Sequence, residues 1–434
     1  MLLNERGISL PLTLLILLVV TSLAIGLVAL AGHEPSISRN LAESAQARFA
    51  AEAGVEATFD TLAVTGNWST LLVGANPATG VTLFNNRAIG TLPASHGTYT
   101  VNLRNDTLAG DPAITGVNAD GGGPTNDTNR VMIITSTGNT RQGTRRIRVV
   151  VKKLGYPPNL FPAAFTMPGN EAESVFVGTS FSIDGRGYKM DGTTDATCSS
   201  VYGIAVAPGS NEAAVEGTLS AAQLANIWGK NQTGGVDTSG LNTIAPEPTI
   251  AGATIKSFVD QAKASAEVVI NSDLPLGVSM SNIGSTCAAD PKSQSCWGYK
   301  DPSTGQITSK VVYVKGVTPD PTSLFTALNV SGTSTGYGVL IVEDGDFKIN
   351  GNFAWNGVII VTGKYVGIGF MGGGVQTVYG AVISNETATD PGFKEGWVSG
   401  NAQIRHSCEA MGAAVDNNRR LTNVVAWKEL APGE

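Results

Sequence analysis

Residues 8–31 read ISLPLTLLILLVVTSLAIGLVALA, an apolar run that sets the architecture of the whole chain. The run holds no charged residue, and as a helix its 24 residues reach about 36 Å, enough to cross a hydrocarbon core of roughly 30 Å. A helix also satisfies its backbone polar groups internally, which lipid requires. Pro11 falls in the first turn, where its missing N–H breaks no hydrogen bond. The run therefore predicts a membrane-spanning helix.

A cleaved secretory signal is the main alternative for this segment. Ala29-Leu30-Ala31, directly before Gly32, resembles a signal-peptidase site. However, the apolar core of a signal peptide is about 7–15 residues long, and this run is much longer. The flank at residues 1–6, MLLNER, also carries no net positive side-chain charge. We therefore favour an anchor that stays attached to the rest of the chain.

Helix-forming residues continue beyond the membrane segment. Residues 36–62, SISRNLAESAQARFAAEAGVEATFDTL, are rich in Ala and in charged residues that favour helices. Leu41, Phe49 and Phe59 belong to an apolar stripe near helical spacing. Pro35 lies at the junction, where a kink is expected. The pattern predicts one long helix, with its first half in lipid and its second half beneath a globular head.

The N-terminus combines a short leader ending in Arg6-Gly7, an apolar helix that follows at once, and the segment Ala51–Gly54 (AEAG). In this combination it resembles type IV pilin-like proteins, most closely the PilX-type minor pilin group. The resemblance implies that a prepilin peptidase cuts after Gly7 and that the new N-terminal residue, Ile8, is methylated. It also implies other pilin subunits and pilus assembly proteins as partners, with residues 8–31 in the inner membrane.

One position departs from the pilin pattern. Most pilins carry a glutamate as the fifth mature residue, and Leu12 occupies that position here. Some minor pilins lack the glutamate too. The resemblance with this departure therefore implies an accessory or capping subunit more readily than a repeating major one. It also leaves open a helix that never enters a filament.

Residues 63–155 predict a small antiparallel β domain. Polarity alternates along Thr98–Leu103, and the runs Val131–Ser136 and Arg145–Lys153 read as two further strands. The segment Thr137–Gly143 (TGNTRQG) between these runs is rich in turn formers and predicts a hairpin. A small sheet packed on the end of the N-terminal helix is what a pilin-like head would offer.

The chain changes character after a Pro-Pro pair at 157–158, so residues 156–434 are predicted to form a second β-rich domain. The runs GVLIV, GVIIV and GAVI begin at Gly338, Gly357 and Gly380, which are 19 and then 23 residues apart. Repeats of this length, each with a short strand and a Gly-bounded corner, favour a short β-helix (β-solenoid) with stacked parallel strands. A conventional β-sandwich is the alternative.

Three further segments bear on the second domain. The segment Phe347–Gly351 (FKING) is echoed upstream by Phe181–Gly185 (FSIDG). Unbroken apolar strands imply cover on both faces, and Ile255–Ile270 is predicted to be a covering helix. The solenoid segment and the ending Ala426–Leu430 (AWKEL) also resemble C-terminal regions of PilX-like proteins.

These observations predict a mainly β protein with a long N-terminal α-helix, in the shape of a pilin-like lollipop. Its predicted parts are a leader at 1–7, a transmembrane and extended helix at 8–62, a small antiparallel β domain at 63–155, and a β-rich domain with solenoid-like repeats at 156–434.

Four cysteines, an even number, suit an oxidising compartment and predict disulfides: Cys198, Cys287, Cys296 and Cys408. Four cysteines allow three pairings, and the sequence does not choose among them. Cys287 and Cys296 flank a short polar loop and could close on each other, which would leave Cys198 and Cys408 to join distant parts of the head. No Cys/His spacing typical of a zinc site is present.

Composition and motifs argue against catalysis, cofactors and nucleic-acid binding. The net charge is −7, so no basic face for nucleic acid is expected. The three histidines, His33, His96 and His406, have no metal-binding spacing. Residues 367–372 match GxGxxG, but a β-like run follows them where a dinucleotide site needs a helix. A polysaccharide-cleaving β-helix would want carboxylates beside a basic residue along one groove, and none is visible.

Two oxygen-rich clusters offer the ligand type of a calcium site. Ca²⁺ wants six to eight oxygen ligands and tolerates flexible loops. The spacing in both clusters fails the EF-hand pattern, and Asp, Asn and Gly are also ordinary corner residues, so we predict no metal site. The clusters are Asp344, Asp346, Asn350 and Asn352, and Asp111, Asp120 and Asp127.

The sequence thus favours a non-enzymatic accessory pilin-like subunit of a type IV pilus or related secretion pseudopilus. The anchor would sit in a bacterial inner membrane with the C-terminal part outside the cytoplasm. The alternative is a membrane-anchored binding or adhesion module that does not enter a filament. The two differ in whether the chain is processed at Gly7 and whether its helix contacts other pilins.

Overall fold

The computed structural model describes most of the chain, and the described residues form two compact units. The first unit comprises Met1–Phe59, Ser69–Val151 and Val424–Glu434, and the second comprises Asp60–Trp68 and Lys152–Asn423. The described residues are 9–157, 159–169, 172–209, 211–230, 244–246, 252–273, 277–317, 325–388, 395–416, 418 and 421–431.

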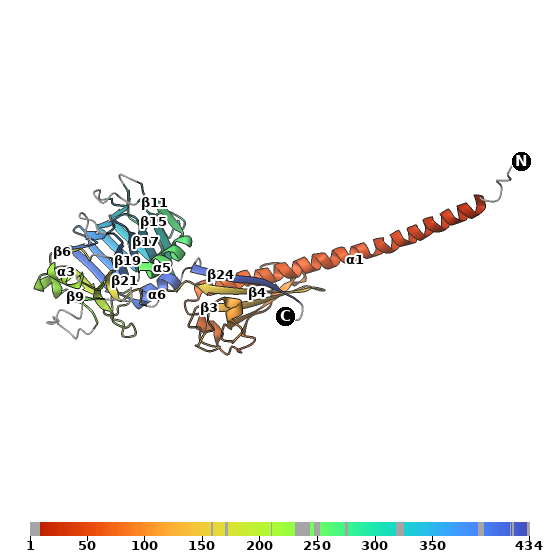
Figure 1. Cartoon of the computed structure of the whole chain (residues 1–434), viewed down its shortest axis with the longest axis horizontal. Coiled ribbons are helices and arrows are strands. Elements are labelled where there is room, and N and C mark those ends of the chain that lie inside the picture. Colours follow the sequence, from red (N-terminus) through yellow and green to blue (C-terminus); the bar gives the residue numbers. More distant parts are fainter. Residues whose placement is uncertain are drawn as a thin grey trace. The chain divides into compact units, whose positions relative to one another are not determined.

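Helix α1 runs over 56 residues, Ser9–Val64 (Figure 1). It passes through Pro35 without interruption, so the predicted junction lies inside one continuous helix. Ion pairs one turn apart, such as Arg48 with Glu52 at 3.0 Å, lie along its second half. Each such pair adds a few tenths of a kcal/mol, roughly 0.3, to the helix. The long N-terminal helix predicted from the sequence is confirmed.

The first unit contains a five-stranded sheet in the order β1-β2-β3-β4-β24. Strand β1 pairs antiparallel with β2, and β2 pairs antiparallel with β3. Strands β3 and β4 are neighbours joined by a tight turn, in which the Thr140 N–H donates to the Gly143 carbonyl oxygen at 2.8 Å. The predicted hairpin is therefore confirmed. The bounds are β1 Val81–Ala88, β2 Thr98–Asn105, β3 Val131–Asn139, β4 Thr144–Lys153 and β24 Thr422–Leu430, with short helices η2 Trp68–Leu72, η3 Ala94–His96 and α2 Pro112–Thr115.

Small residues bring the second half of α1 against this sheet. Ala47, Ala50 and Ala51 are fully buried. A Cβ atom added to Gly138 of β3 would collide with the Ala47 carbonyl oxygen, and one added to Gly54 would collide with the Ser136 hydroxyl. The helix backbone therefore lies directly on the sheet at these two points, which only glycine permits.

The edge strand β24 departs from the sequence prediction. The sequence assigned its residues to the 156–434 domain, whereas the structure places β24 beside β4. Ala426 packs against Val131, Ile133 and Val150, which form a small core on the sheet. Along the chain, the final strand therefore follows the residues of the second unit but belongs to the sheet of the first.

The second unit contains two larger sheets. The eleven-stranded sheet has the path β10-β8-β5-β21-β19-β17-β15-β11, and the six-stranded sheet has the order β12-β16-β18-β20-β22-β6. Neighbouring strands in both run parallel. From β16 to β23 the chain alternates between the two sheets. The strand bounds are β5 Ala163–Met167, β6 Ser174–Val177, β7 Ser182–Asp184, β8 Tyr202–Val206, β9 Ile227–Trp228, β10 Ile244–Pro246, β11 Val268–Asn271, β12 Val278–Ser281, β13 Tyr299–Lys300, β14 Ile307–Thr308, β15 Lys310–Lys315, β16 Leu328–Ser331, β17 Thr333–Glu343, β18 Phe347–Asn350, β19 Asn352–Gly363, β20 Ile368–Met371, β21 Val375–Glu386, β22 Gly396–Ser399 and β23 Asn401–His406.

The three repeat glycines lie side by side across the long strands. Gly338 of β17 pairs with Gly357 of β19, which pairs with Gly380 of β21. Their φ angles are 133°, 137° and 141°, a conformation that other residues rarely adopt. A Cβ on Gly357 or Gly380 would also collide with the carbonyl oxygen of the preceding glycine. The 19- and 23-residue spacings therefore mark one structural position repeated on successive strands.

Alternate residues of the long strands face two separate cores. In β17, Leu340 and Val342 belong to the core shared with the six-stranded sheet, whereas Val339 and Ile341 belong to a core covered by helices. This two-sided burial explains why the strands read as unbroken apolar runs. The covering helices are α5 Gly252–Ala264 and α6 Cys408–Asp416, while α3 Asn211–Gly217 and α4 Ala221–Leu224 complete the unit.

Two details of the sequence prediction are wrong here. The covering helix ends at Ala264, and the residues from Val268 form strand β11. The β-branched run Val268-Val269-Ile270 is better suited to a strand, and it pairs with β15. The echo between FKING and FSIDG does not mark equivalent positions, because β18 lies in the six-stranded sheet and β7 pairs with β23 and β9.

Candidate functional site

The first half of α1 is the most unusual surface among the described residues. Leu10–Val28 has a mean hydropathy of 2.5 and is 0% buried, and it is the one candidate membrane span in the part of the chain that the structure describes. Thirteen large apolar side chains between Leu10 and Val28 are exposed. A segment of this length and composition suits a bilayer or the apolar surface of other helices.

The few polar side chains in this segment bond to their own helix. The Thr21 hydroxyl donates to the Leu17 carbonyl oxygen at 2.7 Å, and the Ser22 hydroxyl donates to that of Leu18 at 2.7 Å. Because these hydroxyl groups already donate to backbone carbonyl oxygens, moving Thr21 and Ser22 from water into lipid leaves no hydroxyl donor unsatisfied.

The predicted processing site adjoins this segment. Gly7 and Ile8 lie outside the described residues, so the predicted cleavage and methylation stay predictions. Leu12, at the position of the usual pilin glutamate, is in the helix and is 56% exposed. The start of the helix therefore offers an apolar side chain where most pilins offer a carboxylate.

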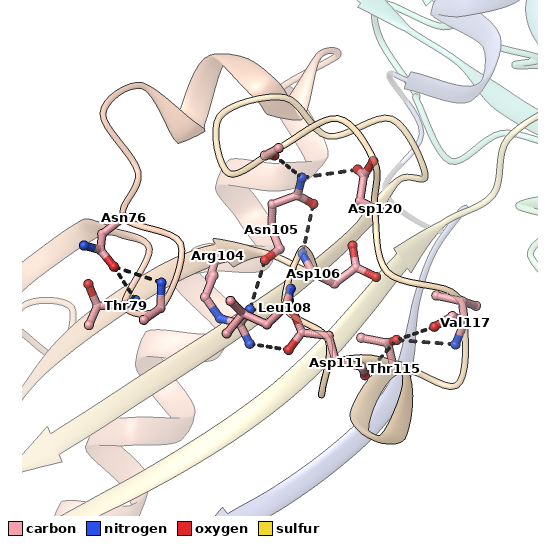
Figure 2. Close-up of polar contacts among 12 residues, drawn as sticks. Asn76, Thr79, Arg104, Asn105, Asp106, Leu108, Asp111, Thr115, Val117 and Asp120 are labelled. Carbon is pink, nitrogen blue, oxygen red and sulfur yellow. Dashed lines mark hydrogen bonds and ion pairs between the residues drawn. The ribbon is translucent and has the colours of Figure 1, made fainter.

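The Asp-rich loop of the first unit forms a self-contained polar network (Figure 2). Both nitrogens at the end of Arg104 donate to Asp111, at 2.6 and 2.7 Å, and the Leu108 N–H adds a bond of 2.8 Å. Burial works to raise the pKa of Asp111, but these hydrogen bonds outweigh it and lower the pKa. Asp111 is therefore held as a carboxylate by its own chain.

The other carboxylates of this loop are also occupied. Asp120 accepts from the Gly122 N–H at 2.7 Å and from the N–H and hydroxyl of Thr128. Asn105 donates to Asp120 at 3.2 Å and accepts from the Asp106 N–H at 3.0 Å, so it links the two residues (Figure 2). Asp106 accepts from the Asn129 amide, while burial raises its pKa to about 6. The hydrogen bonds to Asp111 and Asp120 therefore hold this loop folded through its own polar groups.

The second oxygen-rich cluster consists of corner and ladder residues. Asn350 donates to Asn329 on the neighbouring strand at 2.8 Å, and Asn352 accepts from the Val375 N–H at 3.0 Å. Asp346 accepts from the Gly367 N–H at 3.2 Å. The GxGxxG segment that begins at Gly367 contains strand β20, so it does not open a helix.

The four cysteines form two disulfides, Cys287–Cys296 and Cys198–Cys408. The first closes a short loop, and both of its cysteines are buried, at 1% and 0% exposed. The second joins residues 210 positions apart, and it ties the loop before β8 to the start of helix α6. The sequence left this pairing open, because only the folded sheets bring Cys198 and Cys408 together.

His406 completes a small cluster at the second disulfide. One ligand atom each from Cys198, His406 and Cys408 lie within 4.8 Å of one another. His406 is 3% exposed, and its Nε2 atom is 3.7 Å from the Cys408 Sγ atom. Burial lowers the pKa of His406 to about 4, with the Gly380 carbonyl acting in the opposite direction. Sequence spacing did not predict this cluster, because Cys198 is far away in the chain.

Comparison with known proteins bears on the N-terminus. Residues 6–56 match the family described as PilX N-terminal. A crystal structure of the competence-associated pilin ComZ from Thermus thermophilus is similar at 12% identity, over 89% of this chain and 97% of that one, with a TM-score of 0.23. That score is too low to support a shared fold. No curated protein matches the chain. The PilX match confirms the resemblance predicted from Arg6-Gly7, the apolar helix and the AEAG segment.

Proposed function

We infer that this chain, whose residues 6–56 match the PilX N-terminal family, is a non-enzymatic accessory (minor) pilin-like subunit that contributes to the assembly or the tip of a type IV pilus or related pseudopilus. The exposed apolar half of α1 is the observation that carries the proposal. Burying its thirteen large apolar side chains is worth on the order of 20–30 kcal/mol at about 2 kcal/mol each. Lipid before assembly, and other pilin helices after it, would supply that burial.

The proposed life cycle follows from the pilin resemblance. Residues 1–7 are a leader, a prepilin peptidase cuts after Gly7, and Ile8 becomes the methylated N-terminus. The chain is then a single-pass protein of the bacterial inner membrane, through residues 8–31, with its C-terminal part outside the cytoplasm. Two disulfides in the second unit support that placement, since disulfides persist in oxidising compartments.

The size of the head supports an accessory position. Beyond the sheet at residues 63–155, the chain adds a second β-rich domain at 156–434, which we propose to be a short β-solenoid. In support, successive strands from β16 to β23 alternate between two parallel sheets, and Gly338, Gly357 and Gly380 align across neighbouring strands. A head of this size would be awkward to repeat along a thin filament, whereas a tip or base position accommodates it.

A photo-crosslinking residue in place of Leu17 tests the proposal. Leu17 is 65% exposed in the apolar half of α1, and Leu92, at 49% exposed in a loop of the first unit, is the matched control position. We expect crosslinks from position 17 to other pilin subunits in cells that assemble pili, and none from position 92 to pilin helices.

Crosslinks from position 17 to lipid alone, in cells with assembled pili, would contradict the proposal. That result would favour the alternative, a membrane-anchored binding or adhesion module that does not enter a filament. Leu12 in place of the usual glutamate is the observation that favours this alternative.

A further inference from the structure

The two disulfides of the second unit differ in what surrounds them. Cys287 and Cys296 are buried, and no histidine joins them in a ligand cluster among the described residues. Cys408, in contrast, is exposed and is the first residue of helix α6, while Cys198 is 6% exposed. One residue of the second pair is therefore exposed and the other is buried.

We propose that Cys198, His406 and Cys408 form a redox-gated site for a soft divalent metal ion, with zinc as the natural occupant. In the oxidised protein the two sulfurs are joined as a disulfide. In the reduced protein the two thiolates and the His406 imidazole bind the metal. The three ligand atoms already lie within 4.8 Å of one another, and this is the observation that carries the proposal.

Opening the site requires a dithiol reductant, such as a thioredoxin-class protein. Its thiolate attacks the Sγ atom of Cys408, the exposed residue of the pair, and the electron pair of the broken S–S bond goes to the Cys198 sulfur. The Cys408 N–H donates to the Cys198 Sγ atom at 3.2 Å and so stabilises this leaving thiolate. The second thiol of the reductant then displaces Cys408, which leaves an oxidised reductant and two cysteine thiols. Binding of the metal releases the two thiol protons.

The geometry after reduction suits zinc. Tetrahedral zinc with bonds of about 2.3 Å to sulfur and 2.0 Å to nitrogen holds two sulfurs about 3.8 Å apart and a sulfur and a nitrogen about 3.5 Å apart. The His406 Nε2 atom is already 3.7 Å from the Cys408 Sγ atom. Once the S–S bond is broken, the two sulfurs move to van der Waals separation, which is close to the distance that zinc needs. Water would complete the fourth position.

His406 is placed as a ligand by its backbone. It is the last residue of β23 and pairs in register with Gly380 of β21, while Cys408 follows two residues later. Its Nδ1 atom is buried and makes no hydrogen bond of good geometry with the residues that the structure describes. A buried imidazole that turns Nε2 toward a cysteine sulfur offers the ligand type that zinc prefers with thiolates.

Binding of Co²⁺ to the full-length protein in detergent tests the proposal, since cobalt is a coloured probe for zinc sites. The protein is reduced with a phosphine, which is then removed without oxygen. We expect the reduced protein to bind one Co²⁺ per chain, with thiolate-to-cobalt charge-transfer absorption and the strong visible bands of tetrahedral cobalt, and Zn²⁺ to displace it. The oxidised protein should show neither signal. Alkylation and mass spectrometry should find Cys198–Cys408 reduced before Cys287–Cys296.

Variants assign the ligands. Replacing Cys198 with Ser should weaken cobalt binding and reduce the charge-transfer absorption, because only the Cys408 thiolate remains, whereas a Cys287→Ser, Cys296→Ser double variant should retain both. His406→Gln should weaken cobalt binding by about 100-fold or more, because losing a ligand costs more than the second-shell changes that cost about 10–100-fold. His96→Gln, at the exposed histidine of the first unit, is the matched control and should change nothing.

Three results would overturn the proposal. They are a reduced wild-type protein that binds no cobalt, a His406→Gln variant that binds it as tightly as wild type, and a reduced protein that loses its circular dichroism and does not regain it with cobalt. The comparison of oxidised with reduced wild type needs no variant, so the proposal stays testable even if a substituted chain fails to fold.

Discussion

The two halves of helix α1 differ both in composition and in surroundings: residues 8–31 carry no charge, whereas residues 36–62 mix Ala with charged side chains. In the second half, Ala47, Ala50 and Ala51 are fully buried against a sheet, and Gly54 allows the closest approach. In the first half, from Leu10 to Val28, nothing in the described part of the chain covers the helix. Small residues thus mark the half that packs within the chain, and large exposed residues mark the half that the described residues leave uncovered.

A charge in the middle of the first half should have the largest effect. Leu18→Arg places a guanidinium at the centre of the span, which costs about 2.5–3.5 kcal/mol of insertion free energy. That corresponds to a shift of about 100-fold or more away from the membrane-integrated form. Leu41→Arg is the matched control, because Leu41 is 66% exposed on the same helix against 65% for Leu18. Carbonate extraction of membranes followed by immunoblotting measures the outcome. Equal retention of both variants would contradict the assignment of Leu10–Val28 as the span.

An enlarged residue between α1 and the sheet should destabilise the first unit by about 3 kcal/mol. Gly138→Val forces a side chain against the Ala47 carbonyl oxygen, and overpacking of this kind costs about 1–3 kcal/mol or more. Gly110→Val is the control, because a Cβ there has nothing within 4 Å. Urea unfolding of the head gives the free energy difference. A Gly138→Val variant as stable as wild type would show that the helix does not rest on β3.

The sharpest comparison uses the same substitution in both halves. Gly54→Ala puts a methyl group against the Ser136 hydroxyl and 2.9 Å from the Tyr99 ring, so we expect a loss of about 1–2 kcal/mol in the free energy of unfolding. Gly26→Ala meets nothing within 4 Å and should leave the head unchanged. Thermal unfolding in detergent measures both. If the two variants behaved alike, the difference between the two halves would not be one of packing.

The smallest expected effect is a pH dependence in the first unit, whose sheet the second half of α1 covers. Burial raises the pKa of Asp106 from 3.8 to about 6 in the folded protein. The stability from this group is therefore fully present below pH 4 and is lost as the pH rises through 6. Asp106→Asn should stabilise the first unit at pH 8 by about 1 kcal/mol, and this gain should vanish near pH 4.

The neighbouring carboxyl group supplies a control of opposite sign. The pKa of Asp111 is lowered by its bonds to Arg104 and Leu108, so its contribution is present at pH 8 and fades as the pH falls below 3.8. Asp111→Asn should therefore destabilise at pH 8. Unfolding curves at several pH values give the free energy of unfolding of both variants. If both substitutions changed this free energy in the same direction at pH 8, the burial of Asp106 and the hydrogen bonds of Asp111 could not have the effects assigned to them.

Local patterns in the sequence were enough to predict α1, the β3–β4 hairpin and the helical cover of the long strands. Each depends on residues near one another in the chain, such as the turn formers between Val131 and Lys153. The spacing of the repeat glycines also reflects how the strands align, because Gly338, Gly357 and Gly380 occupy paired positions on neighbouring strands.

Features that depend on distant residues could not be predicted. The pairing of β24 with β4 joins segments separated along the chain by the whole second unit, and the residues Val424–Trp427 give no sign of their partner. The cluster of Cys198 with His406 and Cys408 forms only because β21, β23 and the loop before β8 meet. The end of α5 was missed because an apolar helix and a buried strand look alike over a few residues.

The mature N-terminus, measured by mass spectrometry of the protein from membranes with and without prepilin peptidase, tests the central claim most directly. The account predicts a chain that starts at Ile8, methylated, and that starts at Met1 when the peptidase is absent. A start at Gly32 would contradict it, because the apolar half of α1 would then be a discarded signal. A start at Met1 in the presence of the peptidase would contradict it too, and would leave a plain membrane-anchored protein.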